Sequence, residues 1–244
     1  MIQPMFEFFA VLIAFGAGIT ATISGFGIGS LITPLLSLAY DMRIAIILAA
    51  IPHALATALR FGLIYKNLDH RLFLRFGLAS AAGGLCGAGI QTVLQEDWLS
   101  CTLGVLLLLA GFTGLTKKSW KWRHQTSTFG GFLSGIFGGL VGNQGGIRAA
   151  ALLNLDLEKK TFVAVSTASA LIVDAARLPL YLYSGSSEIA AEWRLIILLC
   201  ASAAAGTFAG MALLKKINDT HFKKTISFLL LALGIFILAK TALL

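Results

Sequence analysis

Apolar segments separated by short polar stretches run along the whole chain. The longer ones cover residues 5–24, 44–64, 72–94, 98–116, 128–141, 161–183, 193–214 and 225–243. Two others, 28–40 and 147–156, are too short to cross the roughly 30 Å hydrocarbon core of a bilayer as helices. The pattern predicts an all-α polytopic membrane protein that combines spanning helices with two short ones.

Each short segment follows a glycine-rich stretch, GFGIGS at 25–30 and GNQGGIR at 142–148. Glycine is the poorest helix former after proline. We therefore expect a broken or re-entrant helix pair at each of these two places.

The two glycine-rich stretches belong to an internal repeat. A shift of 117 residues places Phe15 on Phe132, and also aligns the Gly and charged pairs Gly18/Gly135, Gly25/Gly142, Gly29/Gly146, Asp41/Glu158, Arg43/Lys160 and Arg60/Arg177. After a six-residue insertion near 184–192 the shift becomes 123, which aligns Gly83/Gly206, Gly87/Gly210, Gly111/Gly234 and Lys117/Lys240. The sequence thus predicts two membrane repeats, 1–118 and 124–244, in one integral membrane domain.

Lys and Arg residues indicate how the repeats are oriented. Thirteen of the 19 lie near 64–75, 117–123, 158–160 and 215–224, whereas the loops near 41–43, 95–97 and 184–194, with the C-terminus, hold three. Cytoplasmic loops retain an excess of positive residues. The assignment predicts inverted halves, each a broken pair plus three spanning helices, in a bacterial inner (plasma) membrane with both termini outside.

Composition supports the membrane assignment and excludes other classes. Residues A, V, I, L, M, F, W, Y and C make up 57% of the chain, and only 12% is charged, against about 25% charged in soluble domains. The net charge of +8 is then explained by cytoplasmic loops rather than by nucleic acid. Three cysteines without a CxxC or Cys/His cluster give no metal site, and we expect no cofactor. The N-terminus lacks a signal-peptide pattern and is interpreted as a retained helix.

The two breaks are the main candidates for a binding site. A helix N-terminus presents free N–H groups and about half a positive charge, so two half-helix N-termini brought together suit a small anion. The alternative is close helix packing through small residues, which we favour for the Gly83/Gly87 and Gly206/Gly210 pairs. The candidate substrate-binding residues are Gly25, Gly27, Gly29, Ser30, Gly142, Asn143, Gln144, Gly145, Gly146 and Arg148.

Other ionisable residues inside the apolar segments are candidates for coupling or gating. Arg148 either binds the anion, pairs with a buried carboxylate or extends to the cytoplasmic edge. Arg60 and Arg177 are explained adequately by snorkelling, and Asp174 by an i, i+3 pair with Arg177. His53 is either a proton relay or a core histidine.

The motifs resemble those of the TauE/SafE sulfite exporter family, also called toluene-sulfonate uptake permeases. GFGIGSLITPLL at 25–36 and GIFGGLVGNQGGIRAAALL at 135–153 carry the resemblance, each followed by an acidic–basic turn, DMR at 41–43 and LEKK at 157–160. The resemblance implies a two-repeat carrier of small anions such as sulfite or sulfonates, with both motifs lining the path. The chain departs from the family pattern at Asn143-Gln144, Arg148, Ala151 (usually Pro) and Ile28 (often Gly). These departures bear on the identity of the substrate, because the polar residues that line the path select it.

The favoured hypothesis is a secondary carrier that moves a small anionic substrate across the bilayer by alternating access. Two alternatives remain. A membrane-embedded enzyme would need a nucleophile with a base or metal ligands, and the chain has no HExxH or GxSxG motif. A non-transporting assembly subunit has no need for interrupted helices. Homo-oligomerisation is left open.

The inverted topology predicts the labelling of two loops. Single cysteines introduced at Leu68 and Glu188 should react with an impermeant maleimide from opposite sides of the membrane, because the topology places these loops on opposite faces. Labelling of both positions from the same side would contradict the inversion.

Overall fold

The computed structural model describes residues 2–24, 27–115, 127–152, 155, 157–213 and 219–243. Within these ranges the fold is all-helical and contains no strand, as the apolar pattern predicts. The elements are α1 (Ile2–Ser24), α2 (Ile28–Leu36), α3 (Met42–Ile64), the 3-10 turn η1 (Tyr65–Asn67), α4 (His70–Val93), α5 (Glu96–Leu115), α6 (Ser127–Val141), α7 (Gly145–Leu152), α8 (Lys159–Ser184), α9 (Ser186–Ala191), α10 (Trp193–Leu213) and α11 (Asp219–Leu243).

Six helices in the described ranges are long and apolar enough to cross a membrane. They lie in α1, α3, α4, α5, α8 and α10. The sequence also predicts six crossings, but it assigns α11 rather than α1 to the set. Helix α1 has 23 residues, about 34 Å at 1.5 Å per residue, and is thus long enough to cross a bilayer. Its end at Ser24 is therefore not explained by the helix being short.

Helix boundaries follow the two repeat offsets. Helices α2 and α7 begin 117 residues apart, at Ile28 and Gly145, and α3 and α8 begin at the same offset. Helices α4 and α10, and likewise α5 and α11, begin 123 residues apart. The short helix α9 occupies the insertion between the two registers. The backbone thus breaks at equivalent places in both halves, while their inversion across a membrane stays a prediction.

The two halves pack against each other through two equivalent pairs of helices. Helix α1 packs along α10, and its equivalent α6 packs along α4. A Cβ atom on Gly206 would overlap the carbonyl oxygen of Phe15, and one on Gly83 would overlap that of Phe132. Those two contacts are repeat equivalents of each other. The packing interpretation is confirmed for Gly83, Gly87, Gly206 and Gly210.

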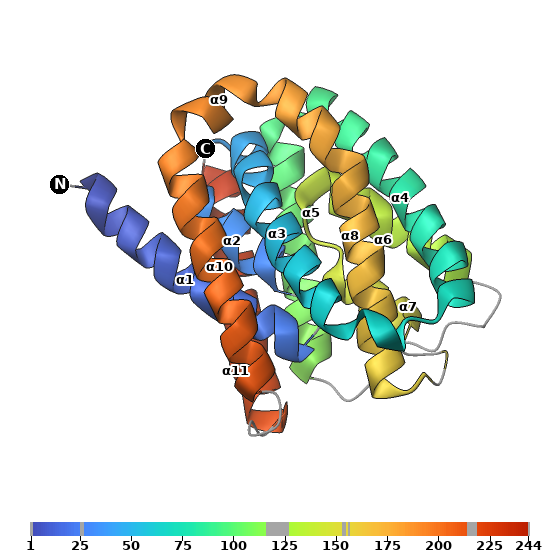
Figure 1. Ribbon diagram of the computed structural model, residues 1–244. Coiled ribbons are helices and arrows are strands. Elements are labelled where there is room, and N and C mark those ends of the chain that lie inside the picture. The colour runs from blue at the N-terminus through green and yellow to red at the C-terminus, as the bar shows by residue number, and fades with distance from the viewer. Residues whose placement is uncertain are drawn as a thin grey trace.

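Loops predicted to share a side meet at the same end of the bundle. At one end, the backbone N–H of Arg43 donates to Glu96 Oε2 at 2.9 Å, and the end of α2 adjoins Glu188 and Lys240. At the other end, Leu68 packs in a cluster with the start of α8. Helix α9 and the C-terminus lie at the first end, away from the turn between α3 and α4 (Figure 1). Which end is cytoplasmic stays a prediction.

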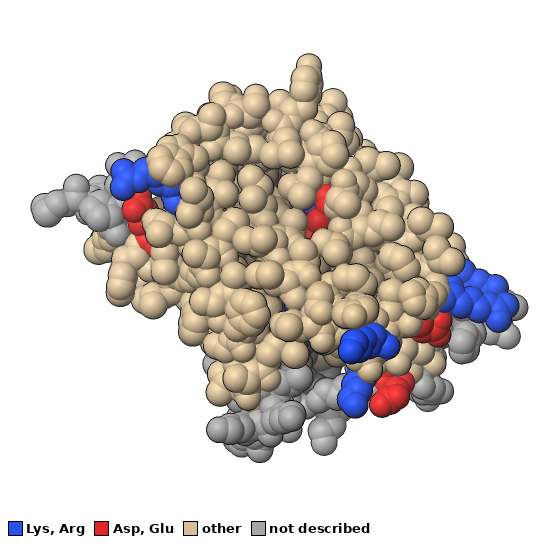
Figure 2. All heavy atoms as spheres, viewed as in Figure 1, with Lys and Arg blue, Asp and Glu red and all other residues tan. Residues whose placement is uncertain are grey.

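The surface is largely apolar. Most of the face in Figure 2 carries no charged side chain, and its Lys and Arg residues gather near the edges. Exposed Phe, Leu and Ile side chains occur on most of the long helices. Such a surface suits lipid, and together with the six long apolar helices it describes a multi-pass membrane protein.

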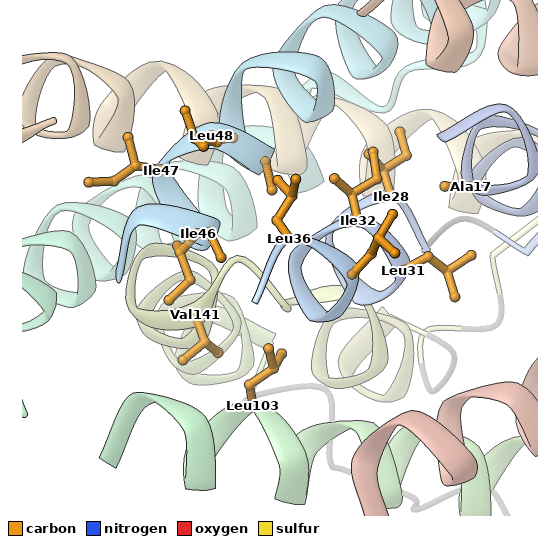
Figure 3. Packing of buried hydrophobic residues seen from close by; sticks show 14 of the residues in the cluster. Ala17, Ile28, Leu31, Ile32, Leu36, Ile46, Ile47, Leu48, Leu103 and Val141 are labelled. Atoms are coloured by element: carbon orange, nitrogen blue, oxygen red, sulfur yellow. The ribbon is translucent and has the colours of Figure 1, made fainter. Parts of the chain in front are cut away.

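Helix α2 is enclosed by protein. All nine of its residues are buried, and it packs against α1, α3 and α11. Because unpaired backbone groups are tolerated at membrane depth only inside protein or beside a cavity, this burial makes the break before α2 possible. The surrounding cluster, shown in Figure 3, includes Ile28, Ile32, Leu36, Ile46, Leu103 and Val141.

The glycine contacts predict that an alanine at a packed glycine destabilises the protein more than an alanine at an unpacked one. Gly83→Ala and Gly206→Ala should each destabilise the protein by about 1–3 kcal/mol, because the added methyl overlaps a backbone carbonyl. Gly89→Ala is the matched control on α4, since nothing lies within 4 Å of its Cβ position. The measurement is the thermal unfolding midpoint in detergent. A wild-type midpoint for Gly83→Ala would disprove the contact.

Candidate functional site

Both helix breaks contain a glycine in the left-handed region. Gly27, just before α2, has φ 140°, and Gly142, just after α6, has φ 71°. Side-chain-bearing residues rarely adopt these angles. The new helices begin with Leu31 N–H donating to Gly27 O and Arg148 N–H donating to Gln144 O, each at 3.0 Å. The first-turn N–H groups of α2 and α7 therefore lack intrahelical acceptors.

The two breaks meet in the middle of the molecule. A Cβ atom on Gly29 would overlap the carbonyl oxygen of Gly142. Ser30 Oγ donates to Asn143 Oδ1 at 3.0 Å, so the first turn of α2 is joined to a residue two positions before α7. The contact places N-terminal turns from both halves side by side, as their repeat positions predict.

A small cavity lies where the breaks meet. Its volume is about 10 Å³, close to the minimum for one water molecule. The lining residues are Ala21, Gly27, Ile28, Gly29, Ser30, His53, Arg60, Gly142, Asn143, Gln144, Gly145 and Arg148. Most of the predicted substrate-binding residues are thus brought together. Gly146 instead faces Ala110 of α5, and Gly25 lies outside the described residues.

An ion-pair cluster adjoins this cavity. Asp174 Oδ1 accepts from Arg177 Nε at 3.0 Å and from Arg177 Nη2 at 2.7 Å, which confirms the predicted i, i+3 pair. Asp174 Oδ2 lies 2.7 Å from Nδ1 of His53 on α3. His53 therefore contacts the carboxylate with one ring nitrogen while it lines the cavity.

The three arginines are buried rather than extended toward an interface. Arg60, Arg148 and Arg177 are 3%, 2% and 1% exposed. The snorkelling interpretation is therefore wrong for all three. Arg148 Nε donates to Ser166 Oγ at 2.8 Å, whereas Arg60 and Arg177 donate to backbone carbonyls of Ala21 and Gly138. Position in the sequence places a residue near the end of a span but does not give the direction of its side chain.

Several contributors to the site carry no sequence signal. Tyr181 donates to Gly139 O, and its ring lies 5.5 Å from the guanidinium carbon of Arg177. Ser134 Oγ donates to Gln144 O at 3.2 Å. Unpartnered buried atoms among the described residues include Asn143 Nδ2 and both amide atoms of Gln144. Amide groups that are buried without a partner are expensive, which suits a site that closes on a ligand.

A second cavity lies at the other end of α2. Its volume is about 450 Å³, and Tyr40, Asp41, Glu188 and Lys240 help to line it. Burial, with a hydrogen bond to Glu192, raises the pKa of Tyr40 to about 12, so its hydroxyl keeps its proton at neutral pH. Lys240 Nζ donates to Ser37 O at 2.6 Å. Helix α2 therefore lies between the small cavity at the breaks and a larger, more open one.

Comparison with known proteins identifies a family. No curated protein and no solved structure matches the chain significantly. The family model described as "Sulfite exporter TauE/SafE" matches residues 10–238 and so includes both breaks and every residue that lines the small cavity between them. This polytopic helical protein therefore belongs to the sulfite exporter TauE/SafE family of membrane transporters.

Proposed function

We propose that the protein is a secondary carrier for a small anion, such as sulfite, a sulfonate or a related organic anion. The observation that carries the proposal is the convergence of two half-helix N-termini and two buried arginines, Arg60 and Arg148, on one cavity. Free N–H groups at helix N-termini bind anions, and the guanidinium fork binds oxyanions through paired hydrogen bonds.

The polar side chains of the second break give the site its geometry. Asn143 and Gln144 line the cavity beside Gly145, and their repeat equivalents, Phe26 and Gly27, carry no polar side chain. Amide donors on one side only allow the site to distinguish the two ends of an asymmetric anion. The anion is held by the backbone N–H groups and Arg148, while Asn143 and Gln144 set its orientation.

The small volume of the cavity supports alternating access. About 10 Å³ is less than any of these anions needs, so substrate entry requires the halves to separate at the breaks. The contact between Gly29 and Gly142 lies on that boundary. Opening on one side at a time would carry the anion across the membrane without a continuous channel.

The charge of the substrate bears differently on export and on uptake. An anion that leaves a cell with a negative interior gains about 2.3 kcal/mol per charge at 100 mV, so export needs no coupling ion. Uptake would require a proton, for which the His53–Asp174 contact is the available acceptor. The proposed location is the cell membrane, with both termini outside and the bilayer as the environment of the apolar surface.

The first experiment is a flux screen. Purified protein in liposomes is tested with sulfite, sulfate, thiosulfate, small sulfonates and small carboxylates, and empty liposomes serve as the control. We expect saturable flux of at least one of these anions. Failure of all of them would contradict the proposal.

Substitution of Arg148 tests the site itself. Arg148→Gln should weaken transport of the selected anion by about tenfold or more, because a charge-assisted hydrogen bond is worth about 1.5–3 kcal/mol. Arg75→Gln is the matched control, since Arg75 is exposed on α4. Both variants are compared at equal amounts in the membrane. Wild-type flux by Arg148→Gln would exclude a role for this arginine.

A further inference from the structure

Arg60 and Arg177 occupy equivalent places in the two halves and make equivalent hydrogen bonds. Arg60 Nη1 donates to the carbonyl of Ala21, and Arg177 Nη1 donates to the carbonyl of Gly138. Each carbonyl lies three residues before the end of a broken helix, α1 or α6. The helix dipole favours a cation at such a C-terminal turn, and the Gly138 carbonyl also accepts a hydrogen bond from the N–H of Gly142 at 3.1 Å. Each arginine therefore caps the cut end of one helix.

The two caps differ in how their charge is neutralised. Asp174, one turn before Arg177, accepts two hydrogen bonds from it. The equivalent position in the first half is Thr57, which is fully buried and whose hydroxyl has no partner in the described part of the chain. Nε of Arg60 is also buried without a hydrogen-bond partner there. The first half thus has the arginine but lacks the carboxylate at this position.

Among the described residues, no other acidic group takes the place of the missing carboxylate. Both oxygens of Asp174 are already engaged, one by Arg177 and the other by His53. The ion pairs within the described ranges include none with Arg60. Arg60 does line the cavity between the two breaks. Asp174 acts on the charge of Arg60 electrostatically but makes no direct ion pair with it. A buried charge without a directly paired counter-charge is unfavourable, so a bound anion would stabilise it.

We propose that the transported anion supplies to Arg60 the negative charge that Asp174 supplies to Arg177. The proposal rests on the anion-carrier function and adds a specific subsite to it. The group bound at Arg60 is an oxyanion with at least two acceptor oxygens, such as a sulfite, sulfonate or carboxylate group, because it replaces an aspartate in a paired interaction. A neutral or cationic group at this end of the substrate is disfavoured.

Thr57→Asp tests the subsite by installing the missing carboxylate. The introduced carboxylate lies one turn before Arg60 and should pair with it as Asp174 pairs with Arg177. Sulfite is the probe, and its binding to purified protein in detergent is measured by calorimetry. We expect Thr57→Asp to bind sulfite about 10- to 100-fold more weakly than wild type, the effect of one charge-assisted interaction. Thr57→Asn, of matched size but neutral, should bind as wild type does.

The thermal midpoint without sulfite separates this mechanism from misfolding. Thr57→Asp should have a midpoint at or above that of wild type, because Arg60 gains a partner, and sulfite should no longer raise it. A lower midpoint, a variant that does not fold, or equal weakening by Thr57→Asn would overturn the proposal. Arg60→Gln gives a second test, with sulfite binding also reduced about 10- to 100-fold.

The binding measurements distinguish failure of the Arg60 subsite from failure of the carrier function. If wild-type protein binds none of the anions of the flux screen, the carrier function itself fails. If wild type binds sulfite and both Thr57→Asp and Arg60→Gln bind it equally well, the anion-carrier function stands and the Arg60 subsite is wrong.

Discussion

A helix that is cut inside a membrane leaves backbone N–H and C=O groups without partners, and those groups have to be satisfied where water is scarce. This protein cuts two helices, α1–α2 and α6–α7. It encloses the cut ends in protein and places a buried arginine on a last-turn carbonyl of each first segment. The opposite sides of the two breaks, the N-termini of α2 and α7, are left facing one cavity. Because a helix N-terminus carries a partial positive charge, this cavity is where we propose that an anion binds.

The same interactions make the two halves unequal. Symmetric backbone breaks and symmetric arginines are combined with side chains that occur in one half only, among them His53, Asn143, Arg148 and Asp174. Asp174 pairs with Arg177 in the second half and contacts His53 across the boundary between the halves. The first half has Thr57 at the equivalent position and so no such carboxylate. The cavity between the breaks is therefore asymmetric although the backbone around it repeats.

Much of the fold is predictable from the sequence because glycine and charge recur at fixed offsets. The register of 117 and then 123 residues matches the helix starts, and the glycines assigned to packing do lie against a helix of the other half. The positions of the two breaks are predictable for the same reason, since the conformations at Gly27 and Gly142 favour glycine. The direction in which a side chain points is harder to predict from the sequence. Arg60 and Arg177 lie where snorkelling is plausible, yet they turn inward to cap carbonyls. The His53–Asp174 contact joins helices from different halves, so no short-range spacing of residues in the sequence predicts it.

The central claim is that an anion binds between the two breaks, and its location is the most direct test. A crystal structure of the protein grown with selenate or selenite would locate the anion by the anomalous scattering of selenium. The account predicts an anomalous peak in the cavity lined by Gly29, His53, Arg60 and Gly145, with its oxygens toward Arg60 and the N-terminus of α7. A peak found only elsewhere, in protein that transports the same anion, would contradict it.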